Sequence, residues 1–214
     1  MEEEHMEDVL GAVKTKRLSG DELLVSDDGI PKTRLINFWR WAYSGITDNA
    51  LRGVLAEFIV ATAIGINENK VRNTWDTYDL ETKNGTSIEV KSAAYLQSWK
   101  QKGLSKISFD CGKKQLDNTL EQDGKSLRRA DLYIFALLNH IEKATWDPLD
   151  LSQWEFWVVP TIKLDEKIGD TKQIGLSSLQ NMGYSAVKYS GLEKAIEKAS
   201  EEQNALLKTA EGIE

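Results

Sequence analysis

The sequence predicts an α/β fold in which helices flank a central β-sheet. Residues 132–138 form a nearly continuous apolar run, as expected of a strand that is buried on both faces. A second strand pattern covers 154–159 and is closed by Pro160. An apolar helical segment and a hairpin pattern precede both strands. The order helix, strands, helix, strand, strand is that of an α/β sandwich.

Helix caps and turn residues place the remaining elements. Thr47, Asp48 and Asn49 are each suitable N-caps for a helix that runs to Gly65. In chain order, the sequence further predicts an acidic helix at 2–17, an aromatic helix at 35–43 closed by Ser44-Gly45, strands near 76–82 and 86–94, a helix at 113–122, a turn near Asp123-Gly124, and a C-terminal helix with the apolar stripe Leu192, Ala195, Ile196, Ala199, Leu206 and Leu207.

A length of 214 residues suits one domain with terminal additions. We divide it into an N-terminal helical extension (1–45), a core (46–160) and a C-terminal extension with the amphipathic helix, packed on the same domain (161–214). No apolar run approaches the ~20 residues that span a bilayer, and the acidic N-terminus lacks the features of a signal peptide. The single cysteine, Cys111, excludes an internal disulfide and a multi-cysteine zinc site. We therefore expect a cytoplasmic protein with no membrane partner.

Charge is unevenly distributed along the chain. The net charge of -7 argues against a nucleic-acid partner, because phosphate binding favours basic surfaces. Nine acidic residues fall in 1–28 and six in 192–214, against three basic residues in each segment. The segment 91–129 is reversed, with nine Lys or Arg against four acidic residues. This positive segment fits a surface that follows a phosphate backbone, and it fits a solvated mixed surface equally well.

Glu57 is the only ionisable residue in the apolar helical segment 54–66. Gly53 and Ala61 lie one turn away on either side, so the helix face around Glu57 is narrow. Burial of an unpaired carboxylate is costly, and the usual remedies are a partner, a metal or a raised pKa. Glu57 is therefore a candidate site residue. The alternative is an acid at the helix edge that pairs with Arg52 or another base.

The hairpin can close over Lys83-Asn84-Gly85 in two ways. A two-residue Asn-Gly turn pairs Leu80 with Glu89 and mixes apolar and charged side chains on each face. A three-residue loop with Gly85 in the left-handed conformation pairs Leu80 with Ile88. This loop is favoured because it pairs apolar residues with apolar residues on one face. A slip of one residue would move every side chain to the opposite face of the sheet. The same register places Tyr78 opposite Val90 and Asp79 opposite Glu89, with Lys91 further along the same face.

Asp79, Glu89 and Lys91 form a group that suits a hard cation. Two carboxylates at cross-strand distance repel each other unless positive charge lies between them. Mg²⁺ takes one or two carboxylates and keeps waters and substrate phosphate oxygens. A metal-activated water could attack phosphorus, with Lys91 lowering its pKa or stabilising the developing negative charge. The alternative is an exposed hairpin face with an ordinary ion pair.

At these residues the chain resembles the PD-(D/E)XK nuclease superfamily. Asp79 matches the first acid of the family, Glu89-Val90-Lys91 its (D/E)-x-K element, and Glu57 the acid on the helix before the sheet. Tyr78 stands in place of the proline that gives the family its name. The resemblance implies a restriction-endonuclease-like αβββαβ core with a central mixed sheet flanked by helices, and extra helices at both ends of the chain.

The resemblance also implies the roles of the site residues. Asp79, Glu89 and Glu57 would bind Mg²⁺, with Mn²⁺ as an expected substitute, and Lys91 would assist the attacking water. Gln97 and Gln115 are candidates for a supporting glutamine that some members carry after the lysine.

The segment 94–102 interleaves aromatic and basic residues, a pattern that can stack bases and contact phosphates. Trp99 could stack on a base or pack in the core, whereas Trp154 and Trp157 are expected in the core. The candidates for contact with nucleic acid are Gln97, Trp99, Lys100, Lys102, Lys106, Lys113, Lys114, Arg128 and Arg129.

Other chemistries are poorly supported by this sequence. His5 and His140 are too few for a zinc site or a histidine-based triad. The chain has no P-loop spacing, and Cys111 is expected to be a small buried residue. The leading expectation is a Mg²⁺-dependent DNA endonuclease, in one form a restriction enzyme, which would act as a homodimer if it cuts both strands. The alternative is a catalytically silent scaffold that binds nucleic acid or a protein partner.

Overall fold

The computed structural model describes residues 15–65, 71–72, 77–114 and 126–211. The chain divides into two compact units. One consists of Met1–Ser44 with Asn67–Arg72, and the other of Gly45–Ile66 with Asn73–Glu214. Most of the acidic helix expected at 2–17 lies outside the described residues, and its last three residues, 15–17, have no regular structure.

The first unit contains a short hairpin and a helix. Strands β1 (Leu23–Val25) and β2 (Pro31–Arg34) pair antiparallel, and helix α1 (Leu35–Tyr43) follows at once. The bounds of α1 are those the sequence predicts, with Ser44 as its C-cap. The hairpin was not predicted because its strands are largely exposed and lack a buried face that would impose alternation.

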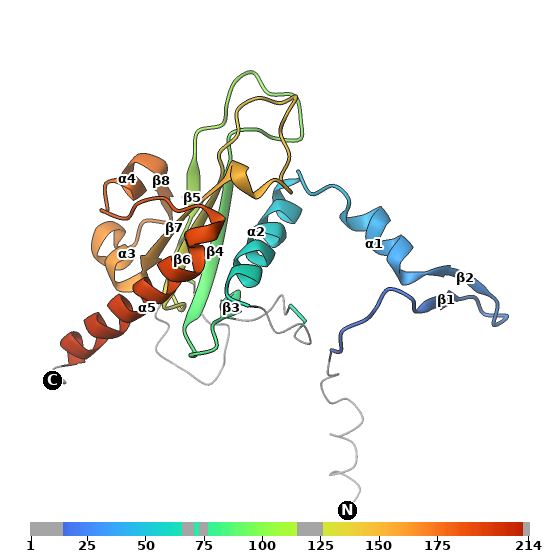
Figure 1. Cartoon of the computed structure of the whole chain (residues 1–214), viewed down its shortest axis with the longest axis horizontal. Coiled ribbons are helices and arrows are strands. Elements are labelled where there is room, and N and C mark those ends of the chain that lie inside the picture. The colour runs from blue at the N-terminus through green and yellow to red at the C-terminus, as the bar shows by residue number, and fades with distance from the viewer. Residues whose placement is uncertain (1–14, 66–70, 73–76, 115–125, 212–214) are drawn as a thin grey trace, which may run out of the picture. The chain divides into compact units, whose positions relative to one another are not determined.

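The second unit is built around a four-stranded mixed sheet (Figure 1). The strands are β3 (Leu80–Glu81), β4 (Ser87–Ala94), β6 (Leu132–Leu138) and β7 (Trp154–Pro160), in the order β3-β4-β6-β7. Strands β4 and β6 are parallel, and the two edge pairs are antiparallel. All seven residues of β6 are buried, as its apolar sequence predicts. Mixed strand directions arise because a crossover joins β4 to β6 and a shorter connection joins β6 to β7.

Helices cover both faces of this sheet. Helices α2 (Asn49–Ala63) and α5 (Tyr189–Glu211) pack on one face against Ile88, Ile134 and Phe156. Helices α3 (Thr161–Ile168) and α4 (Leu176–Gln180) belong to the core on the other face, which contains Phe135. Trp154 and Trp157 are buried, so their predicted place in the core is confirmed. The predicted α/β class, with a central mixed sheet and flanking helices, is also confirmed.

Several elements differ from the expected αβββαβ order in detail. Strand β5 (Ser108–Asp110) pairs with β8 (Gln173–Gly175) in a separate two-stranded sheet, and a 3-10 turn (Leu151–Gln153) precedes β7. Strand β3 is shorter than the predicted 76–82. The expected helix at 113–122 falls mostly outside the described residues, as do Gln115 and the turn near Asp123-Gly124. Across the described ranges, no helix has the length and apolarity required to cross a membrane.

Candidate active site

The hairpin of β3 and β4 positions the predicted site. Leu80 pairs with Ile88, which confirms the register chosen from hydrophobic consistency. Thr82 donates a backbone hydrogen bond to the Thr86 carbonyl at 2.9 Å, so the loop spans 83–85. Gly85 has a φ of 82°, the left-handed conformation that the three-residue loop requires. The backbone N–H of Asp79 donates to the Ile88 carbonyl at 3.0 Å and continues the pairing toward Glu89.

Glu89 is a buried carboxylate that is held by two lysines. Its side chain is 3% exposed, and its Oε1 accepts hydrogen bonds from Lys91 Nζ at 2.6 Å and from Lys114 Nζ at 2.7 Å. Lys91 lies on the same strand, whereas Lys114 comes from the segment after β5. A buried carboxylate requires such partners, because an unpaired charge is costly to desolvate. Burial together with the Glu89 charge raises the pKa of the Tyr133 hydroxyl, which comes from the adjacent strand β6.

Asp79 lies next to this ion pair. Its Oδ2 accepts a hydrogen bond from the backbone N–H of Val90 at 2.7 Å, which fixes the carboxylate against β4. Burial, followed by the charges of Glu89 and Glu57, raises the pKa of Asp79 to about 6, against the opposing effects of the Val90 hydrogen bond and Lys91. A carboxyl with a pKa this close to neutrality is typical of functional sites, and a cation would favour its ionised form.

Glu57 is half-buried on α2, the helix that packs on β4. Asp48 caps α2 by accepting the Ala50 N–H at 2.9 Å, and Gly65 follows the helix with a positive φ, as predicted. The effect of Glu57 on the pKa of Asp79 places its charge within electrostatic range of the hairpin acids. Arg52, considered above as its partner, donates from Nη1 to Gln97 Oε1 at 3.3 Å.

These side chains have donor types that fit a magnesium ion. Within the described residues, no three or more His, Cys, Asp or Glu side chains converge as a ready-made metal site. Mg²⁺ does not require such a cage, since it uses one or two carboxylates and completes its shell with waters and substrate phosphates. Asp79 and Glu89 supply hard oxygen donors, and their mutual repulsion, expressed in the raised pKa of Asp79, is what a cation would relieve.

Comparison with known families decides the class of the protein. The model of the bacteriophage T4 endonuclease IV family matches residues 41–173, which is more than half of the chain. The chain belongs to this family. Comparison with curated proteins and with solved structures gives no match. Membership makes the chain a nuclease and supports DNA as its substrate, and the matched range contains α2, the hairpin and strands β4 to β7 of this endonuclease.

Two of the predicted DNA-contact residues have structural roles in the endonuclease. Gln97 is buried and donates to the Ala94 carbonyl at 3.0 Å and to Ser105 Oγ at 3.1 Å. The Arg128 side chain is fully buried, pairs with Asp165 and donates to the carbonyls of Cys111, Gly169 and Thr171. Their polar groups have partners within the fold, and contact of these two residues with DNA stays a prediction.

The other predicted DNA-contact residues differ in exposure. Trp99, Lys100, Lys102 and Lys106 are exposed. Lys113 pairs with Asp170 at 2.7 Å, and Arg129 is half-buried with its Nε enclosed. Cys111 is buried, as predicted, and burial raises the pKa of its thiol, which argues against an activated nucleophile.

Lys114 is the site residue whose position the sequence did not reveal. It was a candidate for DNA contact, but its direct contact with Glu89 was not expected. Burial lowers the pKa of Lys114, but the hydrogen bond and charge of Glu89 outweigh this effect, and the pKa is raised overall. No local signal predicts the contact, because it joins residues 25 positions apart. The indication that the sequence offered for the role of Lys114 was the excess of basic residues in segment 91–129.

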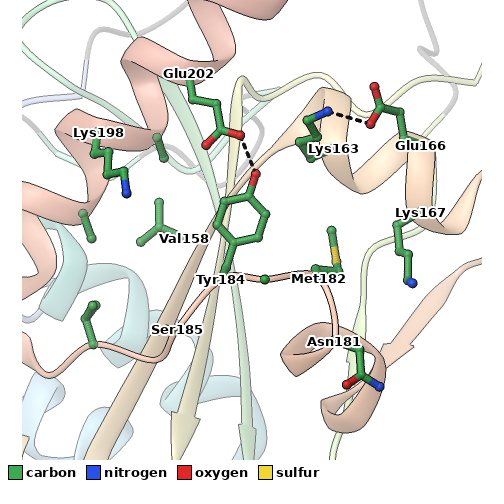
Figure 2. Close-up of a pocket in the computed structure, with 14 residues that line it drawn as sticks. Val158, Lys163, Glu166, Lys167, Asn181, Met182, Tyr184, Ser185, Lys198 and Glu202 are labelled. Carbon is green, nitrogen blue, oxygen red and sulfur yellow. Dashed lines mark hydrogen bonds and ion pairs between the residues drawn. The ribbon is translucent and has the colours of Figure 1, made fainter.

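A separate pocket lies away from these residues (Figure 2). Its volume is about 780 Å³, and it lies between α3, the segment 181–187 and α5. Lys163 pairs with Glu166 at 2.9 Å at its edge, and Tyr184 donates to Glu202 at 2.8 Å across it. None of Glu57, Asp79, Glu89 or Lys91 lines this pocket.

Proposed function

We propose that this chain is a Mg²⁺-dependent DNA endonuclease of the PD-(D/E)XK type, with Asp79, Glu89, Lys91 and Glu57 as its catalytic residues. Asp79 and Glu89 would hold the ion, and Glu57 would contribute directly or through water. When bound, Mg²⁺ supplies positive charge to the phosphate and lowers the pKa of a water molecule. The observation that carries the proposal is the buried Glu89 carboxylate, which contacts Lys91 beside a second acid whose pKa is raised to about 6.

The reaction is hydrolysis of a phosphodiester. A water oxygen bonds to phosphorus, the bond from phosphorus to one ester oxygen breaks, one water proton passes to solvent, and the leaving oxygen takes up a proton. Lys91 is suited to orient the attacking oxygen or to stabilise negative charge on the phosphate, because its ammonium group is fixed by Glu89 at 2.6 Å. Asp79 is held in place by the Val90 N–H, so little reorganisation is needed on substrate binding.

A panel of DNA substrates tests this proposal. Supercoiled plasmid, linear duplex and single-stranded DNA are incubated with the full chain in Mg²⁺, in Mn²⁺ and in EDTA. Cleavage in either metal and none in EDTA is expected. Equal cleavage in EDTA would contradict the metal dependence and would argue against the hairpin acids as the catalytic site.

Restriction-type action would require cutting of both strands. We propose a homodimer for this case, with one hairpin site for each strand. Plasmid products separate the possibilities, because a dimer that cuts both strands converts supercoiled DNA directly to linear DNA. Accumulation of nicked circles, with a monomeric mass in solution, would argue against both the dimer and the restriction role.

A further inference from the structure

Lys114 forms the second contact to the catalytic carboxylate. Its Nζ lies 2.7 Å from Glu89 Oε1, the same oxygen that Lys91 Nζ contacts at 2.6 Å. Two ammonium groups therefore converge on one oxygen of a side chain that is only 3% exposed. One lysine on the same strand would already pair with Glu89. The second comes from a distant segment, so its presence requires a separate explanation.

The backbone holds Lys114 in this position. The Lys114 N–H donates to the Leu127 carbonyl at 3.0 Å, and the Leu127 N–H donates back to Lys114 at 3.2 Å. This isolated antiparallel bridge fixes the backbone of Lys114, which follows β5, against Leu127, which precedes β6. The β3–β4 hairpin positions the backbone of Glu89, and the bridge to Leu127 positions the backbone of Lys114.

The two lysines differ in their access to solvent. The Lys91 side chain is 24% exposed, whereas that of Lys114 is 61% exposed. An ammonium group has three donors, and Lys114 uses one of them on Glu89. Of these two lysines, Lys114 is therefore the more accessible to a polyanion in solvent.

The charge balance of the proposed site also favours a role for Lys114. Asp79, Glu89 and Glu57 carry three negative charges when ionised, and Lys91 alone offsets one of them. With Lys114 and one divalent ion, the group has one excess positive charge, which a single phosphodiester cancels. Without Lys114 the same group is neutral before DNA arrives, and it has no net attraction for phosphate.

We propose that Lys114 is a second catalytic lysine, which contacts the scissile phosphodiester while Lys91 serves the attacking water. This inference rests on the proposed function of the hairpin acids. In the absence of DNA, Glu89 keeps the Lys114 ammonium group in place. With DNA bound, the other donors of Lys114 bind a non-bridging phosphate oxygen and stabilise its negative charge.

Single-turnover cleavage at saturating DNA and Mg²⁺ tests the contact. Lys114→Ala should lower the rate constant by about 100-fold, as expected for loss of one preorganised donor. Lys114→Arg, which keeps the charge, should recover most of the lost rate. Lys188→Ala is the matched control, because Lys188 is 52% exposed and also pairs with a carboxylate, Glu155, at 3.4 Å. This control should cleave at the unmodified rate.

DNA affinity in EDTA supplies a readout that does not depend on catalysis. The slope of log Kd against log salt should fall by about 0.7 to 0.9 in Lys114→Ala, the effect of one lost phosphate contact, and should not change in Lys188→Ala. An unchanged rate at saturating DNA, or an unchanged salt slope, would overturn the inference. Failure of the proposed function is recognised separately, since Asp79→Asn and Lys91→Ala would then retain full cleavage whatever Lys114→Ala does.

Discussion

Asp79 combines two features that affect how the enzyme responds to pH. Its carboxylate is fixed by the Val90 N–H, yet burial, with Glu89 and Glu57 nearby, raises its pKa to about 6. Only the ionised carboxylate can bind a cation, so protons and Mg²⁺ would compete for Asp79 if it holds the proposed ion. Because the pKa of Asp79 lies near neutrality, this competition should change the cleavage rate within the pH range where nucleases are usually assayed.

Cleavage should therefore depend on pH in a defined direction. At Mg²⁺ concentrations below saturation, the rate should rise with pH and level off above about 6, where Asp79 is ionised. Because the ion favours the carboxylate, more Mg²⁺ should move the midpoint to lower pH. Rate profiles from pH 5 to 8 at two Mg²⁺ concentrations check this. A rate that is flat across this range at both concentrations would contradict the assignment of Asp79 as a metal ligand.

Neutralising Asp79 should stabilise the fold. Its folded-state pKa lies above the unfolded value, so its stabilising contribution is complete below about pH 4 and is lost as pH rises through about 6. In Asp79→Asn the side chain cannot ionise, so this stability is retained at high pH, and the amide oxygen still accepts the Val90 hydrogen bond. The variant should melt about 2 to 5 °C higher than the unmodified chain at pH 7.5 without metal, and at the same temperature near pH 4. Thermal unfolding at both pH values measures this, and a lower melting temperature at pH 7.5 would contradict it.

At the scale of elements, the loop of the β3–β4 hairpin requires a left-handed residue at position 85. Gly85 has a positive φ of 82°, and a Cβ there would meet no atom within 4 Å, so its constraint is conformational and not steric. Gly85→Ala should destabilise the fold by about 1 kcal/mol in urea unfolding. Gly103→Ala is the control, because Gly103 also has open space around it and no positive φ. Equal stability of the two variants would show that the loop does not need the left-handed residue.

The hairpin register could be predicted because its evidence is local. Pairing Leu80 with Ile88 depends only on side-chain alternation and on one glycine in the loop, and both are visible in the sequence. Strand β6 was equally accessible because it is buried on both faces. Strands β1, β2, β5 and β8 have three or four residues each, too few for an alternating pattern to be recognised, so their pairing depends on tertiary context.

Arg128 illustrates what the sequence could not provide. A basic residue in a basic segment suggests DNA contact, yet its partners, Cys111, Asp165 and Gly169, lie 17 to 41 positions away. Burial of this kind is produced by contacts with α3 and with segments distant in the sequence, and it has no local signature. The same reason explains why the contact between Lys114 and Glu89 was missed, while Asp79, Glu89 and Lys91 were found together.

At the scale of the whole second unit, Arg128 joins segments that the central sheet does not connect. It links the end of β5 to α3 and to the loop before β8. Arg128→Ala should destabilise the fold by about 3 to 5 kcal/mol, because it removes the partner of Asp165 and the donor to the buried Cys111 carbonyl. Lys163→Ala, which removes an exposed pair with Glu166, should cost less than about 1 kcal/mol. Urea unfolding compares the two, and a small effect for Arg128→Ala would contradict its structural role.

Family membership spans 41–173, a range that contains the hairpin, Lys114, Arg128 and all four proposed catalytic residues. Helix α5 lies beyond this range and completes the core over α2 and the sheet. The nuclease identity is therefore carried by the matched segment, while the stability of the same unit also depends on the C-terminal helix.

The decisive measurement is the single-turnover rate of DNA cleavage by Lys91→Ala in Mg²⁺, beside the unmodified chain and Lys188→Ala. Circular dichroism should show that all three proteins are folded. If the hairpin is the catalytic centre, Lys91→Ala should cleave at least about 100-fold more slowly than the other two. A folded Lys91→Ala protein that cleaves DNA at the unmodified rate would contradict the catalytic assignment of the hairpin.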